Sequence, residues 1–496
     1  MKLFTLFATV LVLIAGCVTP PPPVVEPTTE PVTQPVVAPP AADFRETPPD
    51  PLAPRPWEFP EVTRVTLDNG LRVLVAENHS APLATIRAVV RSGAEYDPSG
   101  DAGLATFTAD MLDEGAGGMT AIEIAEAFGN LGTQIGTWAE WDMSGAGVDV
   151  LSANLDPALE LFATVLLDPA FQQSDADRLR AQRIALLVQQ RDNASVVANN
   201  RFASIVYGQT PYGRAVLGTE ESVADFARDD VLAFYRRYYV PNNASIIVTG
   251  DVDSDAVIAS LRGLFGEWDR GPEVQEIAID PPPREANEIF IIDRPQAVQS
   301  EIRVGHAGVA RSTEDFFPLL VMNTILGGNF GSRININLRE RHGYTYGARS
   351  AFSFRREEGP FYVSTPVRTE VTLPAVQEIM GELRRIREGD VSDEELAAAK
   401  NYQAGIFPAT VESASDLANR LTDLEVYGLP EDYFETYQQQ IMSVTAEDVR
   451  NVANEYLSPG EAAIVIVGKA SDIQQPLAQL GFPVGIYDLE GNPVVK

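Results

Sequence analysis

The chain repeats its own order of helices and strands at a spacing of about 217 residues, and this repeat is the strongest constraint on its fold. The stretch "RDDVLAFYRRYYVPNNASIIVTGDV" (228–252) has the pattern of a helix, a turn and a buried strand. The stretch "AEDVRNVANEYLSPGEAAIVIVGKA" (446–470) has the same plan, with an acidic helix start, a proline in the turn and a hydrophobic strand. An internal duplication of this length predicts two similar domains in one chain.

Within each copy the patterning predicts an α+β domain. In the first copy, alternating apolar residues predict strands on both sides of the turn Asp68–Gly70, and helical spacing follows. The segments expected to form further strands are 84–97, 142–152, 301–309 and 359–369, and those expected to form helices are 103–115, 120–132, 155–169, 175–193, 315–328, 372–389 and 391–407. We expect domains at 61–270 and 289–496 joined by a linker at 271–288, each a mostly antiparallel sheet with helices on one face.

Capping residues predict where two of the long helices begin. Ser174 or Asp175 is the expected cap of the helix that runs to Asn193. Ser392 and Glu395 have the spacing of a capping box, in which each side chain bonds the backbone N–H of the other residue.

The first residues predict export and lipidation. Residues 1–17, "MKLFTLFATVLVLIAGC", have one lysine, an apolar run and small residues before Cys17, which is a secretion signal in length and order. The ending "IAGC" resembles the lipobox of bacterial lipoproteins, and Val18 in place of aspartate favours the outer membrane over the inner one. The alternative is an ordinary signal peptide with an incidental cysteine. Residues 18–60 are rich in proline and predict an extended tether.

Charge and histidine usage exclude several classes of function. The formal net charge is −33, which argues against binding nucleic acid, because phosphate contacts require clustered lysine and arginine. The three histidines are His79, His306 and His342, and no two are three or four residues apart. No local zinc motif of the H-x-x-x-H kind can therefore form. Each histidine is expected to have a structural role.

Six motifs in order resemble those of the insulinase (pitrilysin) family of zinc metallopeptidases, over residues 61–470. They are "LDNGLRVLV", "RSGAEYDPSGDAGLA", "PYGRAVLGTEESV", "YVPNNASIIVTGDV", "ILGGNFGSRININLRERHGYTYGARS" and "VSDEELAAAK". The resemblance implies two insulinase-like domains arranged as a clam around a peptide chamber.

The resemblance also shows what this chain lacks. Active members carry H-x-x-E-H on the helix after "GLA" and a further glutamate on a later helix. The matching positions here are Thr106, Ala109, Asp110 and Leu186, which are too few donors for zinc. The alternative interpretation of Thr106, Ala109 and Asp110 is an ordinary helix surface. Active members also carry Asn-Ala on the substrate-binding strand, where this chain has Gly136-Thr137, but backbone pairing with a peptide needs no particular side chain.

The second domain keeps a motif that the family uses to contact substrate. Arg339 and Tyr346 match an arginine and a tyrosine seven residues apart that point at the substrate carbonyl. Both are hydrogen-bond donors and could stabilise an oxyanion. The alternative is that Arg339 pairs with Glu340 or Glu357 while Tyr346 covers a sheet face. We expect "YTYGARS" to be a strand, which makes Tyr344 the second candidate for the phenol.

Three functions are compatible with these residues. The chain could be the non-catalytic subunit of a heterodimeric peptidase in the periplasm, with no cofactor of its own and zinc in a homologous partner. It could instead be a peptide-binding or scaffold protein without catalytic involvement. The remaining reading is a hydrolase with an unrecognised site. The first function, that of a non-catalytic subunit, requires the motifs that the chain keeps and does not require the motifs that it lacks.

The lipobox predicts that Cys17 anchors the chain to the membrane. Bacterial lipoprotein modification adds several acyl chains, and more than one chain is needed for firm anchoring. A Cys17→Ser variant should lose labelling by radioactive palmitate and move to the soluble fraction. Retention of the unlabelled variant in the membrane fraction would show that something other than lipid holds the protein there.

Overall fold

The computed structural model describes residues 58–494. The described residues all belong to one compact unit. Cys17 and most of the expected proline-rich tether lie outside the described residues. Among the described residues, no helix is long and apolar enough to cross a membrane.

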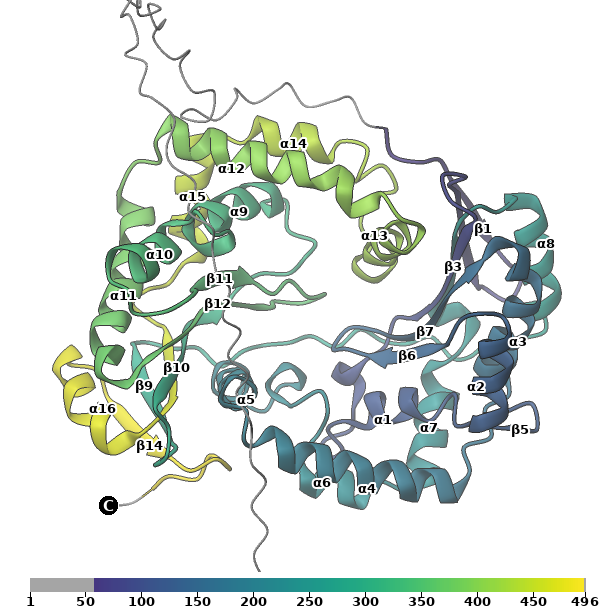
Figure 1. The fold of residues 1–496 in the computed structure, drawn as a ribbon, viewed down its shortest axis with the longest axis horizontal. Helices are drawn as coiled ribbons and strands as arrows, with labels where there is room; N and C mark the ends of the chain where they lie inside the picture. The colour runs from purple at the N-terminus through teal and green to yellow at the C-terminus, as the bar shows by residue number, and fades with distance from the viewer. Residues whose placement is uncertain (1–57, 495–496) are drawn as a thin grey trace, which may run out of the picture. The chain divides into compact units, whose positions relative to one another are not determined.

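The predicted duplication is confirmed by two six-stranded sheets that match in five strands (Figure 1). The sixth strand, at one edge, differs, because β1 is antiparallel to β2 whereas β14 is parallel to β9. The first has the order β1-β2-β8-β3-β7-β6 and the second β11-β12-β10-β13-β9-β14. One strand in each sheet, β8 or β13, ends at the glycine that closes the repeat. It has one antiparallel neighbour and one parallel neighbour, and most other strand pairs are antiparallel. The strands are β1 Val62–Thr66, β2 Arg72–Glu77, β3 Leu83–Val90, β6 Gly136–Ala139, β7 Ser144–Leu151, β8 Ala244–Gly250, β9 Glu288–Asp293, β10 Gln299–Ala307, β11 Arg349–Phe352, β12 Pro360–Arg368, β13 Ala463–Gly468 and β14 Val484–Tyr487.

Helices follow the strands in the same order in both halves, and the predicted α+β class is confirmed. The first half contains α1 Leu104–Asp110, α2 Ala121–Asn130, α3 Leu155–Leu167, α4 Gln173–Gln190, α5 Ala194–Tyr207, α6 Glu220–Asp225, α7 Arg228–Tyr238 and α8 Ser254–Phe265, with a small ribbon of β4 Gly115–Ala116 and β5 Met119–Thr120. The second half contains α9 Phe316–Asn323, α10 Arg333–Asn335, α11 Thr372–Glu388, α12 Asp393–Ile406, α13 Ala414–Tyr427, α14 Tyr437–Ser443, α15 Ala446–Tyr456 and α16 Ala470–Leu477. Residues 271–287, between α8 and β9, form neither helix nor strand.

One of the two predicted helix caps is correct. Ser392 accepts a hydrogen bond from the backbone of Glu395 at 3.2 Å, and the Glu395 carboxylate accepts one from the backbone of Ser392, so the capping box forms. The prediction for α4 is wrong, because the cap is Gln172 and its side chain makes no capping bond. Asp175 lies inside the first turn, where its carboxylate pairs with Arg178.

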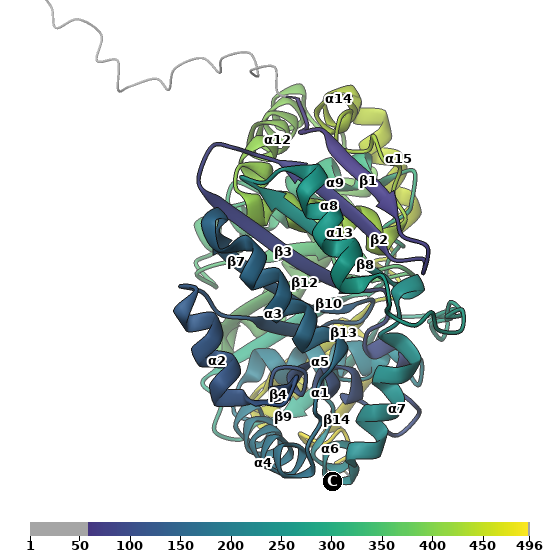
Figure 2. The same cartoon turned by 90° about the vertical axis from the view of Figure 1, so that its right-hand side faces the viewer.

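Each sheet buries one face under its own helices and the other under a helix from the opposite half. On the first sheet, α3 and α8 lie on one side and α13 on the other (Figures 1 and 2). The face under α13 consists of Leu74, Ala76, Val89 and Ile247 packed with Leu417, Ala418, Leu421 and Leu424. On the second sheet, Val197, Phe202 and Val206 of α5 pack with Phe290, Val465 and Val467. Helices α5 and α13 hold equivalent places in the repeat, so the exchange is reciprocal.

Polar contacts accompany this exchange. Arg72 of β2 pairs with Glu425 of α13 at 2.7 Å, and the same buried carboxylate accepts a hydrogen bond from Ser245 of β8. Between β11 and β12, the loop residue Arg356 donates to the buried Glu95 carboxylate and to the carbonyl of Asp142 at 2.7 Å. Burial raises the pKa of Glu95, although the neighbouring guanidinium opposes this shift. The halves are therefore joined by both apolar and ionic contacts.

A substitution in α13 should destabilise the sheet of the opposite half. Leu421→Ala removes a fully buried side chain from the face of the first sheet, and such truncations cost about 2–5 kcal/mol. We expect faster amide hydrogen exchange in β3 and β8, measured by mass spectrometry. The control is Ile406→Ala, a half-exposed residue of α12. Unchanged exchange in β3 and β8 of the Leu421 variant would show that α13 does not support the first sheet.

Candidate functional site

The helix that carries the metal motif in active relatives is retained and firmly anchored. Helix α1 follows Gly103, which has a φ of 96°, a conformation that glycine adopts readily. The Asp97 carboxylate accepts hydrogen bonds from the backbone N–H groups of Gly103 at 2.7 Å and Ala105 at 2.8 Å. Burial raises the pKa of Asp97 to about 7. The start of the helix is thus fixed by a buried carboxylate and not by a metal.

An arginine from α4 contacts Thr106 and Asp110, two of the positions that the sequence resemblance aligns with the metal motif. The Arg183 guanidinium donates to the Thr106 hydroxyl at 2.9 Å, to the Leu217 carbonyl at 3.2 Å, and to the Asp110 carboxylate in a short ion pair. The Thr106 hydroxyl has one proton to donate, and the carbonyls of Gly103 and Val216 both lie within hydrogen-bond distance of it. Burial raises the pKa of Asp110, and the Arg183 charge opposes that rise. One guanidinium therefore bonds both the hydroxyl and the carboxylate that remain at these positions.

Thr106, Ala109 and Asp110 do not form the simple helix surface that was one interpretation of the sequence. Thr106 is 4% exposed and Ala109 is fully buried, whereas Leu186 on α4 is 41% exposed. Arg183 was not singled out by sequence reasoning. The only feature of the sequence that could have indicated Arg183 is its position, one helical turn before Leu186. The resemblance assigns the third zinc ligand of active members to this helix.

These residues do not fit a zinc ion. Zinc sites in proteins use about four donors, chiefly histidine, cysteine and carboxylate groups. Here one carboxylate and one hydroxyl remain, and both already bond a cationic side chain that would repel a metal. Among residues 58–494, no group of three or more histidine, cysteine, aspartate or glutamate side chains is placed to hold a metal ion.

The arginine and tyrosine of the second-half motif lie in an exposed region. Arg339 belongs to a widened, π-helical turn, Ile336–Arg341, of a kind that is frequent at functional sites. Its guanidinium stacks on the ring of Phe330 at 4.2 Å and pairs with Glu340 at 3.5 Å. Tyr346 is 95% exposed. Within the described part of the chain, no hydrogen bond joins Arg339 to Tyr346.

The loop that carries the tyrosines is longer than predicted. The expected strand "YTYGARS" begins only at Arg349, so Tyr344 and Tyr346 precede β11 and do not share a strand face. Tyr344 stacks on His342 with the ring centres 4.9 Å apart, which leaves Tyr346 as the freely exposed phenol. The reason is local, since Thr345 bonds the backbone of Gly347 and closes a turn there.

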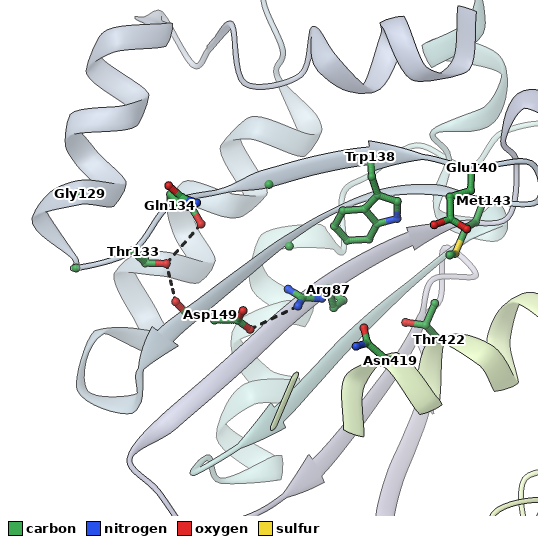
Figure 3. A pocket seen from close by; sticks show the side chains of 13 residues that line it. Arg87, Gly129, Thr133, Gln134, Trp138, Glu140, Met143, Asp149, Asn419 and Thr422 are labelled. Carbon is green, nitrogen blue, oxygen red and sulfur yellow. Dashed lines mark hydrogen bonds and ion pairs between the residues drawn. The ribbon is translucent and has the colours of Figure 1, made fainter. Parts of the chain in front are cut away.

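A groove of about 840 Å³ runs along β6, the edge strand of the first sheet. Figure 3 shows Trp138 and Arg87 pointing into it from the sheet, with Asn419 and Thr422 of α13 opposite. Strand β6 pairs with β7 on one side only. The second predicted substrate-strand residue, Thr137, lies on β6 beside Gly136, which lines the groove. The groove was not predicted, because α13, which forms its far wall, lies about 280 residues later in the chain.

The histidines have local partners, as expected of structural residues. His79 bonds Asp251 at 2.7 Å and Glu77 at 3.3 Å on the surface. His306 is buried between the Ala307 carbonyl and the Ser458 backbone N–H, and burial lowers its pKa.

Comparison with known proteins agrees with this geometry. An uncharacterized zinc protease of Streptomyces coelicolor is 25% identical over 418 residues, which are 83% of this chain and 91% of that protein. A probable mitochondrial-processing peptidase subunit beta of Arabidopsis thaliana is 24% identical over 425 residues, which are 84% of this chain and 80% of that protein. The crystal structure of a peptidase M16 inactive domain from Pseudomonas fluorescens matches with a TM-score of 0.77 at 28% identity, covering 82% of this chain and 98% of that one.

Two family models cover most of the described residues. Residues 72–220 match the model of insulinase (peptidase family M16), and residues 225–403 match the model of the peptidase M16 inactive domain. The first match covers β2, β3, β6 and β7, and the second begins before β8 and ends within α12. The chain therefore belongs to the insulinase family, peptidase family M16.

Proposed function

We propose that this chain is the non-catalytic subunit of a heterodimeric M16 zinc peptidase. It would supply Arg339, Tyr346 and half of the peptide chamber to a homologous subunit that holds the zinc. The observation that carries this proposal is the contrast between the two motif regions. Arg183 satisfies the polar residues at the metal position, whereas Tyr346 remains almost fully exposed beside a π-helical turn that ends in Arg341.

The chemistry of the donor pair supports a role at a site completed by a partner. A guanidinium and a phenol both donate hydrogen bonds, and neither needs to change its protonation state to stabilise a developing oxyanion. Arg339 keeps a partly exposed side chain, and the Phe330 ring covers one of its faces. A substrate carbonyl would approach the Arg339 guanidinium from the side that the Phe330 ring does not cover.

The groove along β6 supports the peptide-binding half of the proposal. An edge strand has backbone N–H and C=O groups that can pair with an added strand, and such pairing accepts many sequences. The groove is bounded by both halves of the chain, since Arg87 belongs to β3 and Asn419 to α13. A peptide bound there would contact both halves at once.

The proposed place of action is the bacterial cell envelope. Cys17 would be lipidated and would hold the chain at the outer membrane, facing the periplasm, with residues 18–60 as the tether. The formal net charge of −33 supports a soluble body that does not adhere to anionic lipid.

A peptide-binding or scaffold role without catalysis is the second candidate. One observation favours it: Arg339 is already engaged by Phe330 and Glu340. In that case the groove would still bind peptides, but the second-half motif would be structural.

The Arg183 contacts predict that the purified chain holds no stoichiometric zinc. Restoring the family motif through Thr106→His, Ala109→Glu, Asp110→His and Leu186→Glu should still give little zinc, because the guanidinium remains in the site. Adding Arg183→Gln to that variant should allow zinc to bind. Elemental analysis after dialysis measures each protein. One tightly held zinc in the unmodified chain would refute the assignment, and full loading of the quadruple variant would show that Arg183 is no barrier.

The donor role predicts a loss of turnover by the mixed complex. Loss of one oxyanion donor typically costs about 10²–10³ in kcat, so Arg339→Ala or Tyr346→Phe should reduce peptide hydrolysis by about that factor. Matched controls are Arg341→Ala in the same turn and Tyr402→Phe on α12. Assembly with the partner and its zinc content, followed by gel filtration and elemental analysis, should not change. Hydrolysis within about twofold of the unmodified complex would favour the scaffold role.

A further inference from the structure

One position on the sheet surface that lines the groove is a glycine, Gly136, and therefore carries no side chain. Gly136 on β6 pairs with Gly147 on β7, and Gly147 pairs with Arg87 on β3, so these three residues form one row across the sheet. A β-carbon added at Gly136 would meet no atom within 4 Å. At the open edge of the sheet, the row therefore ends at Gly136, and the place where a side chain would lie above this residue is unoccupied.

The walls of this space are flat. In the next row, Trp138 pairs with Gly145, and the indole lies against that glycine, since an added β-carbon would come within 3.0 Å of the Trp138 ring. The Arg87 guanidinium lies over Gly147 in the same way, where any β-carbon would clash with it. The guanidinium is 5.9 Å from the centre of the indole ring. Two planar groups thus flank the space beside Gly136.

The charges near this space are already compensated. Arg87 donates to the Ser415 hydroxyl at 2.9 Å and lies 3.6 Å from the Asp149 carboxylate. Asp149 also accepts a hydrogen bond from the Thr85 hydroxyl at 2.6 Å. Because the cation and the anion are paired with each other, neither needs a charged ligand. An uncharged side chain with a planar face complements these walls best, since aromatic rings stack on indole and on guanidinium.

We propose that the space beside Gly136 is a specificity pocket for an aromatic side chain of an extended peptide. This inference rests on the proposed pairing of a peptide with β6. In that pairing, alternate residues of the peptide face the groove, and the one in register with Gly136 extends over it towards Arg87. Trp138 then stacks on the ring from one side. Gly136 determines the specificity, because any larger residue at that position would fill the space.

Binding to the purified full-length chain, without a partner, tests this pocket. The probe is a fluorescein-labelled, unstructured host peptide of threonine, serine and valine with one guest position, read by fluorescence anisotropy. Tyrosine or phenylalanine guests should bind about five- to tenfold more tightly than alanine, whereas lysine and aspartate guests should resemble alanine. Gly136→Leu should abolish the aromatic preference, so that the tyrosine, phenylalanine and alanine guests bind with equal affinity.

The control is Gly405→Leu on α12, where an added β-carbon also meets no atom within 4 Å. It should keep the aromatic preference. Tightest binding of the lysine guest would overturn the proposal in favour of recognition by Glu140, which also lines the groove. Equal binding of all guests would overturn the pocket but leave peptide pairing intact, and no binding of any guest would overturn both. The donor role of Arg339 is judged separately, by hydrolysis in the mixed complex.

Discussion

The reciprocal packing of α5 and α13 is the interaction on which the rest of the structure depends. Each helix leaves its own half and buries its apolar side on the sheet of the other half, where Phe202 and Leu421 are fully enclosed. Neither sheet has a complete set of covering helices from its own half. The groove along β6 is a direct result, because α13 approaches the first sheet closely enough for Asn419 and Thr422 to face Trp138. Stability of the two halves and geometry of the groove therefore have one physical cause.

The Arg183 contacts link α1 to α4 through side chains of the chain itself. Thr106 and Arg183 are buried, and the Asp110 carboxylate, whose side chain is 41% exposed, pairs with the Arg183 guanidinium. The same guanidinium also bonds the Thr106 hydroxyl. A hydroxyl, a carboxylate and a guanidinium thus hold the two helices together. In an enzyme the same positions would have to release one ligand site to water, which a fixed arginine cannot do.

Much of the architecture could be predicted from the sequence, because the repeat and the strand patterns are local properties. The strand pairs around Gly70 and the capping box at Ser392 follow from residues a few positions apart. The start of α4 was misplaced, because Ser174 and Asp175 are good caps in isolation and Gln172 is not. Arg183 and the pocket beside Gly136 could not be predicted, because both depend on side chains brought together from distant segments. An arginine on a helix surface and an arginine in a metal position look alike in a sequence.

The order of α13 in the chain has a consequence for folding during synthesis. When residues up to Phe265 have been made, the first sheet is complete in its strands, but one face still exposes Leu74, Val89 and Ile247. The helix that covers this face, α13, begins at Ala414, about 150 residues later. The first half therefore cannot reach its final state as it emerges, and it waits in a form with an open apolar face. Exposed apolar surface of this kind makes a partly folded chain prone to association, and it is the surface that a chaperone would cover.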